Sequence, residues 1–359
     1  MTKEIKTKPT QHSVKELRSI GIQPDILLCR AKDSLNDNLK KKIALFTNVS
    51  KDAVFSAEDA DSIYDIPIML KGQKMDDFIV SHFSIRGKKS NIKPWIDYKN
   101  KVNKCNKKIK IAMIGKYVDL EDSYKSLNEA LYHAGIINMA QVDIKYLDSD
   151  KINKNNINEL SKMDGILVPG GFGNRGIEGK VLAAEFARRN KIPYFGICLG
   201  MQISVIEFAR NVIKLKKANS TEFDMRTSNP VIALVEEWKD SSGKKIIADK
   251  DNYCVTMRLG SQQCSIIKNS LAHRMYKKIR IDERHRHRYE VNSNFLEYFE
   301  SSDLIFSGKS TKEGLMEIIE LKNHPWYLGC QFHPEFTSSP LTGHPLFNGF
   351  IAASKQGST

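Results

Sequence analysis

Cys198 stands where a sequence could place a nucleophile, between two glycines in the pentapeptide GICLG (196–200). An apolar strand pattern precedes it and a helical pattern follows it. Small residues on both sides permit the sharp turn that lifts a nucleophile above the edge of a sheet. A helix that begins directly behind the turn favours the thiolate and offers backbone N–H groups. The pentapeptide alone is equally consistent with a buried core thiol.

The segment CQFHPEF (330–336) supplies the partners that such a thiol requires. His333 and Glu335 lie two residues apart at the end of an expected strand, and parallel sheets carry their active sites at the carboxyl ends of strands. A thiol nucleophile needs a base, and the base needs a carboxylate that orients it. His333 by itself fits a packed or surface histidine. Together with Cys198, the pair predicts nucleophilic catalysis.

A glycine-rich turn, VPGGFGNRG (168–176), follows another expected strand. Backbone N–H groups in such a turn can point at a developing negative charge, which makes it a candidate oxyanion hole. A phosphate-binding loop and a plain turn remain alternatives. The turn does not end in the GK[ST] of a P-loop.

The elements that must position these residues alternate between strand and helix. We expect strands at 108–117, 141–147, 164–171 and 192–198, and helices at 123–135, 178–190 and 199–209. Gly135 is expected to end its helix as the residue that caps the carboxyl end. Strands and helices that alternate with short connections predict a parallel sheet covered on both faces.

The flanking regions are organised differently. Residues 231–321 are rich in strand patterns, a further strand is expected at 326–332, and a last helix at 345–354. Residues 12–85 suggest helices at 12–21 and 57–64 and strands at 24–30 and 42–49. These are too few strands for a complete domain, so a doubly wound sheet would need more chain before Met1.

The charge is unevenly distributed. The 359 residues, enough for about two domains, carry a formal charge of +14, of which residues 1–110 contribute +10. The stretch from Arg86 to Lys110 holds ten basic residues and one acid, Asp97. We interpret it as an exposed helix or linker between two globular parts, that is, as a solvated connector. Nucleic-acid binding would require aromatic residues among the charges, and only Trp95 and Tyr98 are present.

Composition excludes several classes. The polar N-terminus lacks the apolar region of a signal peptide, and no window approaches the ~18 apolar residues of a membrane span. The six cysteines form no CxxC pair, which favours reduced thiols and a cytoplasmic protein. We therefore expect neither a nucleic acid nor a membrane as partner.

Three motifs together resemble the class I glutamine amidotransferase domain: PGGFG (169–173), GICLGMQ (196–202) and FHPE (332–335). Further segments are similar to the CTP synthase family, namely residues 6–30, NSTEF (219–223), TMRLG (256–260) and ERHRHRYEVN (283–292). The resemblance implies an α/β chain. A class I glutamine amidotransferase fold, a mostly parallel sheet flanked by helices, would occupy residues 108–359. A basic linker (86–107) and a partial P-loop-type α/β synthase domain (1–85) would precede it.

The resemblance also implies a reaction, in which UTP, ATP and glutamine give CTP. A Cys thioester releases ammonia from glutamine, and ATP with Mg²⁺ activates UTP. By motif, Cys198 is the nucleophile, His333 the base and Glu335 its orienting group.

The implied glutamine-binding residues are Gly171, Leu199, Gly200, Met201, Gln202, Glu222 and Arg288, with N–H groups of Gly171 and Leu199 in the oxyanion hole. A zwitterionic substrate fits a carboxylate and an arginine. Without the family, Glu222 and Arg288 look like ordinary surface charges.

The same resemblance assigns a UTP or CTP site to the N-terminal part. Its residues are Lys6, Thr7, Lys8, Pro9, Thr10, Gln11 and Lys42. The sequence contains neither a G-x-x-x-x-G-K-[ST] motif nor the acidic pair that binds Mg²⁺ in the family. We therefore expect a glutaminase half without metal ligands that cannot form CTP alone, from a fragment, a split enzyme or a degraded gene. A homotetramer is expected if the synthase half is supplied.

A second departure concerns GTP, the allosteric activator in the family. Cys254-Val255 stands where Gly-Gly usually precedes TMRLG, which puts GTP activation in question. Three other functions remain open. The chain could be another Cys–His–Glu amide or γ-glutamyl hydrolase of the same fold, a non-catalytic nucleotide-binding partner of a synthase chain, or, least supported, a basic nucleic-acid binder.

Overall fold

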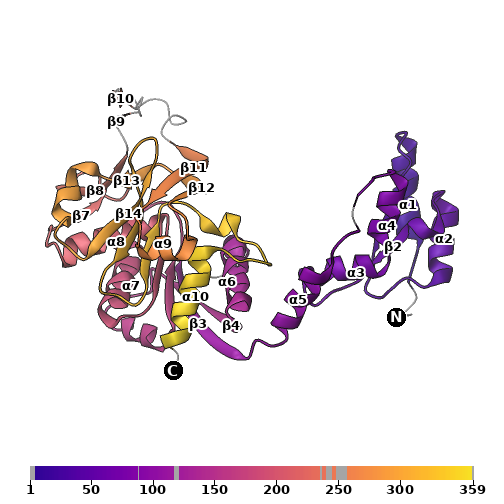
Figure 1. Cartoon of the computed structure of the whole chain (residues 1–359), viewed down its shortest axis with the longest axis horizontal. Helices are drawn as coiled ribbons and strands as arrows, with labels where there is room; N and C mark the ends of the chain where they lie inside the picture. Colours follow the sequence, from indigo (N-terminus) through magenta and orange to yellow (C-terminus); the bar gives the residue numbers. More distant parts are fainter. Residues whose placement is uncertain are drawn as a thin grey trace. The chain divides into compact units, whose positions relative to one another are not determined.

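The structure, a computed structural model, describes residues 5–87, 89–116, 121–234, 237–239, 245–247 and 257–357. The chain folds as two compact units, residues 1–103 and 104–359 (Figure 1). Among the helices of the described residues, none combines the length and the apolar character that crossing a lipid bilayer requires.

The first unit places helices around a two-stranded parallel sheet. Its elements are α1 (Lys8–Ser19), β1 (Leu27–Arg30), α2 (Asp37–Thr47), β2 (Val54–Ala57), α3 (Ile66–Gly72), α4 (Met75–His82) and α5 (Lys93–Val102). Strands β1 and β2 pair from Leu27 with Val54 to Arg30 with Ala57. A small core of Cys29, Leu35, Ile43, Ala44 and Val54 lies between the sheet and α2.

Two expectations for this unit were wrong. Residues 42–49, predicted as a strand, fall mostly in α2, which begins after Asn36, whose side chain accepts a hydrogen bond from Leu39 N. The cap starts the helix before the apolar run, and the run supplies its buried face. Residues 57–64, predicted as a helix, contain the end of β2, a loop and the start of a single 3₁₀ turn. The Gln73 side chain pairs with the Ser56 backbone at 2.8 Å in both directions and so supports the extended chain.

The basic stretch from Arg86 to Lys110 is partly helical. Helix α5 occupies its middle, and Tyr98 on this helix is buried. Trp95 stacks on Tyr64 with ring centroids 6.3 Å apart, and Tyr98 meets the same ring edge-on at 5.3 Å. The two aromatic residues of this stretch therefore pack within the first unit.

The second unit is built on a nine-stranded sheet in the order β12, β11, β14, β15, β16, β6, β5, β3, β4. The five strands that run parallel are β16 (Tyr327–Cys330), β6 (Tyr194–Ile197), β5 (Gly165–Val168), β3 (Lys107–Gly115) and β4 (Ala140–Asp148). The antiparallel extension consists of β15 (Met316–Leu321), β14 (Leu304–Ser310), β11 (Arg258–Ile266) and β12 (Arg280–His287).

A smaller three-stranded sheet stands beside the large one. It consists of β7 (Ala218–Ser220), β8 (Asn229–Leu234) and β13 (Tyr289–Val291). The short strands β9 (Glu237–Lys239) and β10 (Lys245–Ile247) pair with each other. The chain leaves the large sheet at the end of β12 and enters the small one at β13, so a single residue, Arg288, separates the two sheets.

Helices cover both faces of the large sheet, which confirms the predicted α/β class. On one face, α7 (Ile177–Asn190) and α8 (Leu199–Asn211) bury a core that includes Ala184 and Ile203. On the other, α6 (Lys125–Ile137), α9 (Leu271–Tyr276) and α10 (Pro345–Gly357) bury Leu131 and Phe350. Figure 1 shows α6 and α10 next to β3 and β4.

Gly135 does not cap α6, as the sequence suggested, because the helix continues to Ile137. It is buried instead where α6 meets β4. A Cβ at this position would lie 2.8 Å from Val142 Cγ2 and 2.9 Å from Ala140 O. Glycine is required here by the close approach of helix and strand.

Gly135→Ala is expected to lower the free energy of unfolding of the second unit by about 1–3 kcal/mol, because the added methyl group overpacks the helix–strand contact. Chemical denaturation of the full chain measures it. The control is Gly357→Ala at the end of α10, where nothing lies within 4 Å of the new Cβ. Equal stabilities of the two variants would contradict this account of Gly135.

Candidate active site

Cys198 lies in a strained turn between β6 and α8. Its backbone has φ 53° and ψ −104°, which L-residues rarely adopt. A Cβ on Gly196 would lie 2.5 Å from Gly200 O, and one on Gly200 would lie 2.1 Å from Val168 O. Both glycines are therefore needed for close packing around the turn, as the sequence predicted.

The parallel pairing of β6 and β16 brings the second motif to Cys198. Cys198 N donates a hydrogen bond of 2.7 Å to Cys330 O, at the end of β16. His333 follows three residues later. A Cβ on Gly170, in the glycine-rich turn, would lie 2.8 Å from His333 Cε1 and 3.5 Å from Cys198 Cβ. The segments after β5, β6 and β16 thus converge on one place.

His333 is fixed by several contacts. Its Nδ1 lies 2.7 Å from Glu335 Oε1, and its backbone N donates to Arg284 O at 2.8 Å. The Phe336 ring stacks on the imidazole at 5.4 Å. The other ring nitrogen, Nε2, is buried and makes no hydrogen bond within the part of the chain that the structure describes. This nitrogen is available to a proton that moves to or from a reacting group.

The electrostatic environment of His333 favours the imidazolium. Burial acts to lower the pKa of His333, but the interactions with Cys198 Sγ and the Glu335 carboxylate outweigh it and raise this pKa to about 10. A protonated imidazole beside a sulfur can pass its proton to a group that reacts there.

The glycine-rich turn is held against Glu222. Gly173 N donates to Glu222 Oε1 at 2.6 Å, and Lys116 Nζ donates to Phe172 O at 2.6 Å and to Gly173 O at 2.9 Å. Lys116 was not identified from the sequence, where it is one lysine among many. A Cβ on Gly171 would lie 3.4 Å from Leu199 Cδ2, so these two residues are neighbours.

Two buried glutamines connect Cys198 to the backbone of Tyr289, the residue after Arg288. Gln202 Nε2 donates to Tyr289 O at 3.0 Å and lies 3.3 Å from Gln331 Oε1. Gln331 Nε2 in turn lies 3.7 Å from Cys198 Sγ. Gln331 lies in the segment CQFHPEF (330–336), and the sequence indicated no role for it. Its signal in the sequence is a polar residue directly after an apolar strand.

The two charges expected to hold a zwitterion both influence Tyr289. Arg288 is half-buried between β12 and β13. Burial and the charge of Glu222 raise the pKa of Tyr289, whereas Arg288 lowers it. Both charges therefore act on the same side chain. Gly200 and Met201 are buried residues of α8, and the Met201 side chain belongs to the hydrophobic core. These two residues can offer a substrate only their backbone.

Comparison with known proteins identifies the family of the second unit. The family model of class-I glutamine amidotransferases matches residues 119–353. The chain belongs to this family. The glutaminase domain of CTPS from Trypanosoma brucei, solved with bound acivicin, is 37% identical with a TM-score of 0.61, over 69% of this chain and 94% of that domain.

The rest of the amidotransferase chain has relatives too. The family model of the CTP synthase N-terminus matches residues 1–85. CTP synthase from Buchnera aphidicola subsp. Schizaphis graminum (strain Sg) is 53% identical over 358 residues, which cover 98% of this chain and 64% of the relative. The similarity to known proteins therefore includes residues 1–85 as well as the amidotransferase region. It spans less than two thirds of the length of this curated relative.

The residues predicted to bind a nucleotide lie in the first unit of this amidotransferase. Lys8, Pro9, Thr10 and Gln11 form the first turn of α1, directly after Lys6 and Thr7. Gln11 Nε2 donates to Thr7 Oγ1 at 3.0 Å, and Thr7 is buried. Lys42 is exposed on α2, which packs against α1. Cys254-Val255 lies outside the described residues.

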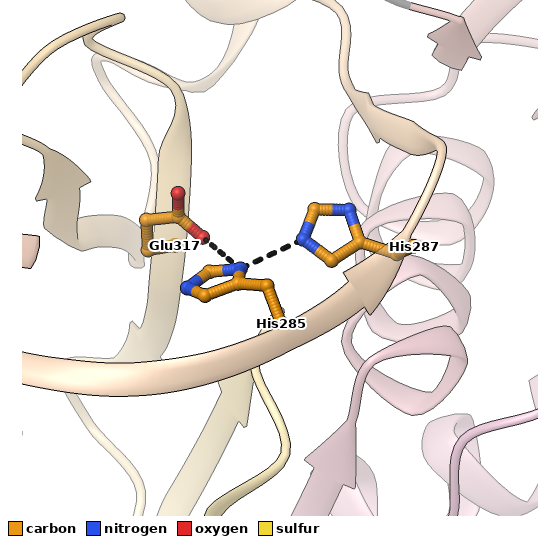
Figure 2. A group of neighbouring side chains, drawn as sticks. All are labelled: His285, His287 and Glu317. Atoms are coloured by element: carbon orange, nitrogen blue, oxygen red, sulfur yellow. Dashed lines mark hydrogen bonds and ion pairs between the residues drawn. The ribbon is translucent and has the colours of Figure 1, made fainter. Parts of the chain in front are cut away.

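One cluster of the amidotransferase unit has metal-ligating side chains. Ligand atoms of His285, His287 and Glu317, all buried, lie within 4.8 Å of one another (Figure 2). The donor set does not suit Mg²⁺, which prefers oxygen ligands. His285 Nδ1 and His287 Nε2 are 2.8 Å apart, closer than the about 3.3 Å that tetrahedral Zn²⁺ imposes on two nitrogens. The distance of 2.8 Å is that of a hydrogen bond between the two imidazole rings.

The effect of Glu335 on His333 is open to measurement. Glu335→Gln is expected to lower the pKa of His333, because it removes one of the two groups that raise it. A histidine whose pKa is higher in the folded state stabilises the fold fully below its unfolded value of about 6.5 and loses this contribution as pH rises to about 10. The Tm deficit of the variant should therefore be largest near pH 6 and disappear above about pH 10.

The control for this experiment is Glu185→Gln, which removes a carboxylate 3.2 Å from the exposed Arg189. Its Tm difference from wild type should not change across that pH range. A deficit of Glu335→Gln that is equally independent of pH would contradict the assigned cause of the His333 shift.

Proposed function

We propose that the second unit hydrolyses L-glutamine to glutamate and ammonia through a thioester on Cys198. The observation that carries this proposal is the convergence of Cys198, His333 and the glycine-rich turn at the carboxyl ends of three adjacent parallel strands. Family membership supports it further.

In this mechanism Cys198 Sγ attacks the carboxamide carbon, and the thiol proton resides on His333. The N–H groups of Leu199 and Gly171 stabilise the oxyanion. The imidazolium then donates its proton to the leaving nitrogen, so that ammonia departs and a γ-glutamyl thioester remains. Water attacks the thioester with His333 as the base, and glutamate and the thiol are released. Glu335 keeps the imidazole oriented and stabilises its charge.

Substrate recognition follows from charge. The glutamine ammonium would bind Glu222, and the α-carboxylate would bind Arg288. Gln202 borders this position through its bond to the Tyr289 carbonyl. Because Glu222 already accepts Gly173 N–H, bound ammonium would connect the substrate to the loop that carries the oxyanion donor.

The wider proposal is that this ammonia is used to convert UTP to CTP with ATP and Mg²⁺, in a cytoplasmic enzyme that would form a homotetramer once the synthase half is supplied. The matches to CTP synthase support it. Lys6 to Gln11 with Lys42 would contact UTP or CTP, since lysines beside a helix N-terminus suit a triphosphate. The 359-residue polypeptide should form no CTP from UTP, ATP and ammonia, and radiolabelled CTP above background would contradict this.

Cys198→Ala is expected to abolish glutamine hydrolysis, a loss of at least about 10³-fold, because no other group can form the thioester. Glutamate release measures it, and acid quenching with labelled glutamine detects the covalent intermediate. The control is Cys264→Ala, a buried thiol on β11 whose pKa burial raises. Hydrolysis retained in Cys198→Ala would overturn the nucleophile assignment.

A further inference from the structure

Strand β12 presents an unusual buried face to the interior. Its residues alternate between exposed and buried, and the buried positions are Ile281, Glu283, His285 and His287. Three successive inward side chains are therefore polar and titratable. Buried polar groups are expensive unless they are hydrogen-bonded, so their partners indicate what they do.

Glu283 has several hydrogen-bond partners, one of them in the turn that follows His333. Its carboxylate lies within hydrogen-bond distance of Tyr276 OH at 2.7 Å, His344 Nε2 at 2.9 Å and Thr337 Oγ1 at 3.1 Å. Thr337 is the last residue of the 3₁₀ turn Pro334–Thr337, which contains Glu335. The carboxylate thus ties β12 to the turn that orients His333. The bond from His333 N to Arg284 O adds a second tie from the same strand.

The other end of the strand leads into Arg288, which His287 and Glu290 flank in the sequence. His287 precedes Arg288 and Glu290 lies two residues after it, and His287 Nδ1 is 3.4 Å from Glu290 Oε1. Arg258 Nη1 donates to Glu290 Oε1 at 2.9 Å and also bonds Glu317. The carboxylate of Glu290 therefore fixes the chain where it passes from one sheet to the other.

His285 contacts His287, the residue before Arg288. Figure 2 shows its ring between Glu317 and His287, with Nδ1 2.8 Å from His287 Nε2 and 3.7 Å from Glu317 Oε2. Burial lowers the pKa of His285 to about 3 and that of His287 well below its usual range. Both rings are therefore neutral, and each can donate one hydrogen bond and accept another.

We propose that the buried polar face of β12 positions the two halves of the glutaminase site separately. Glu283 holds the His333–Glu335 turn, and His287 with Glu290 holds Arg288 for the substrate carboxylate. These are positioning residues that act through others. The inference rests on the proposed function, because it assumes that His333 acts in the chemistry and that Arg288 binds glutamine.

The first arm tests the catalytic turn in the full chain. Glu283→Gln should lower kcat for glutamine hydrolysis about tenfold and leave KM within about twofold, because chemistry and not binding is affected. The matched control is Glu320→Gln. Glu320 is a buried carboxylate that accepts hydrogen bonds from Leu271 N and Ala272 N, away from the turn. Both variants should lose stability, but only Glu283→Gln should lose kcat.

A second pair of variants, with milder changes, tests the same turn if Glu283→Gln does not fold. Thr337→Val removes one hydroxyl from Glu283 at an exposed position, and Thr337→Ser restores it. The valine variant should lower kcat about fivefold, the cost of one hydrogen bond to a charged group. The serine variant should recover it.

The second arm tests Arg288. Glu290→Gln should raise KM for L-glutamine about tenfold with kcat within about twofold. L-glutaminamide, which lacks the α-carboxylate, should be hydrolysed equally by wild type and variant. The control is Glu313→Gln. Glu313 also contacts Arg258, at 3.5 Å, but lies outside β12 and β13.

The outcomes separate the two proposals. If wild type does not hydrolyse glutamine, the proposed function fails. If wild type is active but Glu283→Gln and Glu290→Gln alter the same kinetic parameter, or neither differs from its control, the positioning inference fails and the proposed function stands. Inhibition by chelators together with zinc bound to purified wild type would also overturn the positioning inference, because His285 and His287 would then be metal ligands.

Discussion

The parallel pairing of β6 with β16 is the contact on which the candidate site depends. It joins segments that are more than 130 positions apart in the sequence and sets Tyr194 opposite Tyr327 and Ile197 opposite Cys330. The register is strict, because a shift of one residue would move every side chain to the other face. Its last bond, from Cys198 N to Cys330 O, puts the thiol turn beside the loop that carries His333.

That pairing can support a strained residue because the surrounding core is rigid. The positive φ of Cys198 costs free energy, and the turn lies between an apolar sheet and α8, whose first eleven residues are all buried. Gly196 and Gly200 remove the steric conflicts that remain. The strained turn has a structural consequence, since it places Cys198 beside Gly170 of the glycine-rich turn.

The antiparallel extension of the sheet has a different part in this arrangement. It contributes no nucleophile, but β12 supplies the carbonyl that holds His333 N, the carboxylate of Glu283, and the exit to Arg288. The polar inner face of β12 lies directly against elements that carry candidate catalytic and binding residues. A fully apolar strand would pack as well, yet it could not fix the direction of these side chains, since dispersion contacts are not directional whereas hydrogen bonds are.

The sequence by itself determined the α/β class, most elements of the second unit, and the chemical identity of a Cys–His–Glu set, because strand periodicity and the glycine spacing around Cys198 are local properties. It misjudged residues 42–49 and the role of Gly135, because an apolar run does not distinguish helix from strand and a glycine does not reveal its neighbours. Only the tertiary structure decided that Gln331 and Lys116 border the site and that Glu283, His287 and Glu290 connect it to the core. These contacts depend on which strands lie side by side, and sheet order is set by long-range pairing that no short segment encodes.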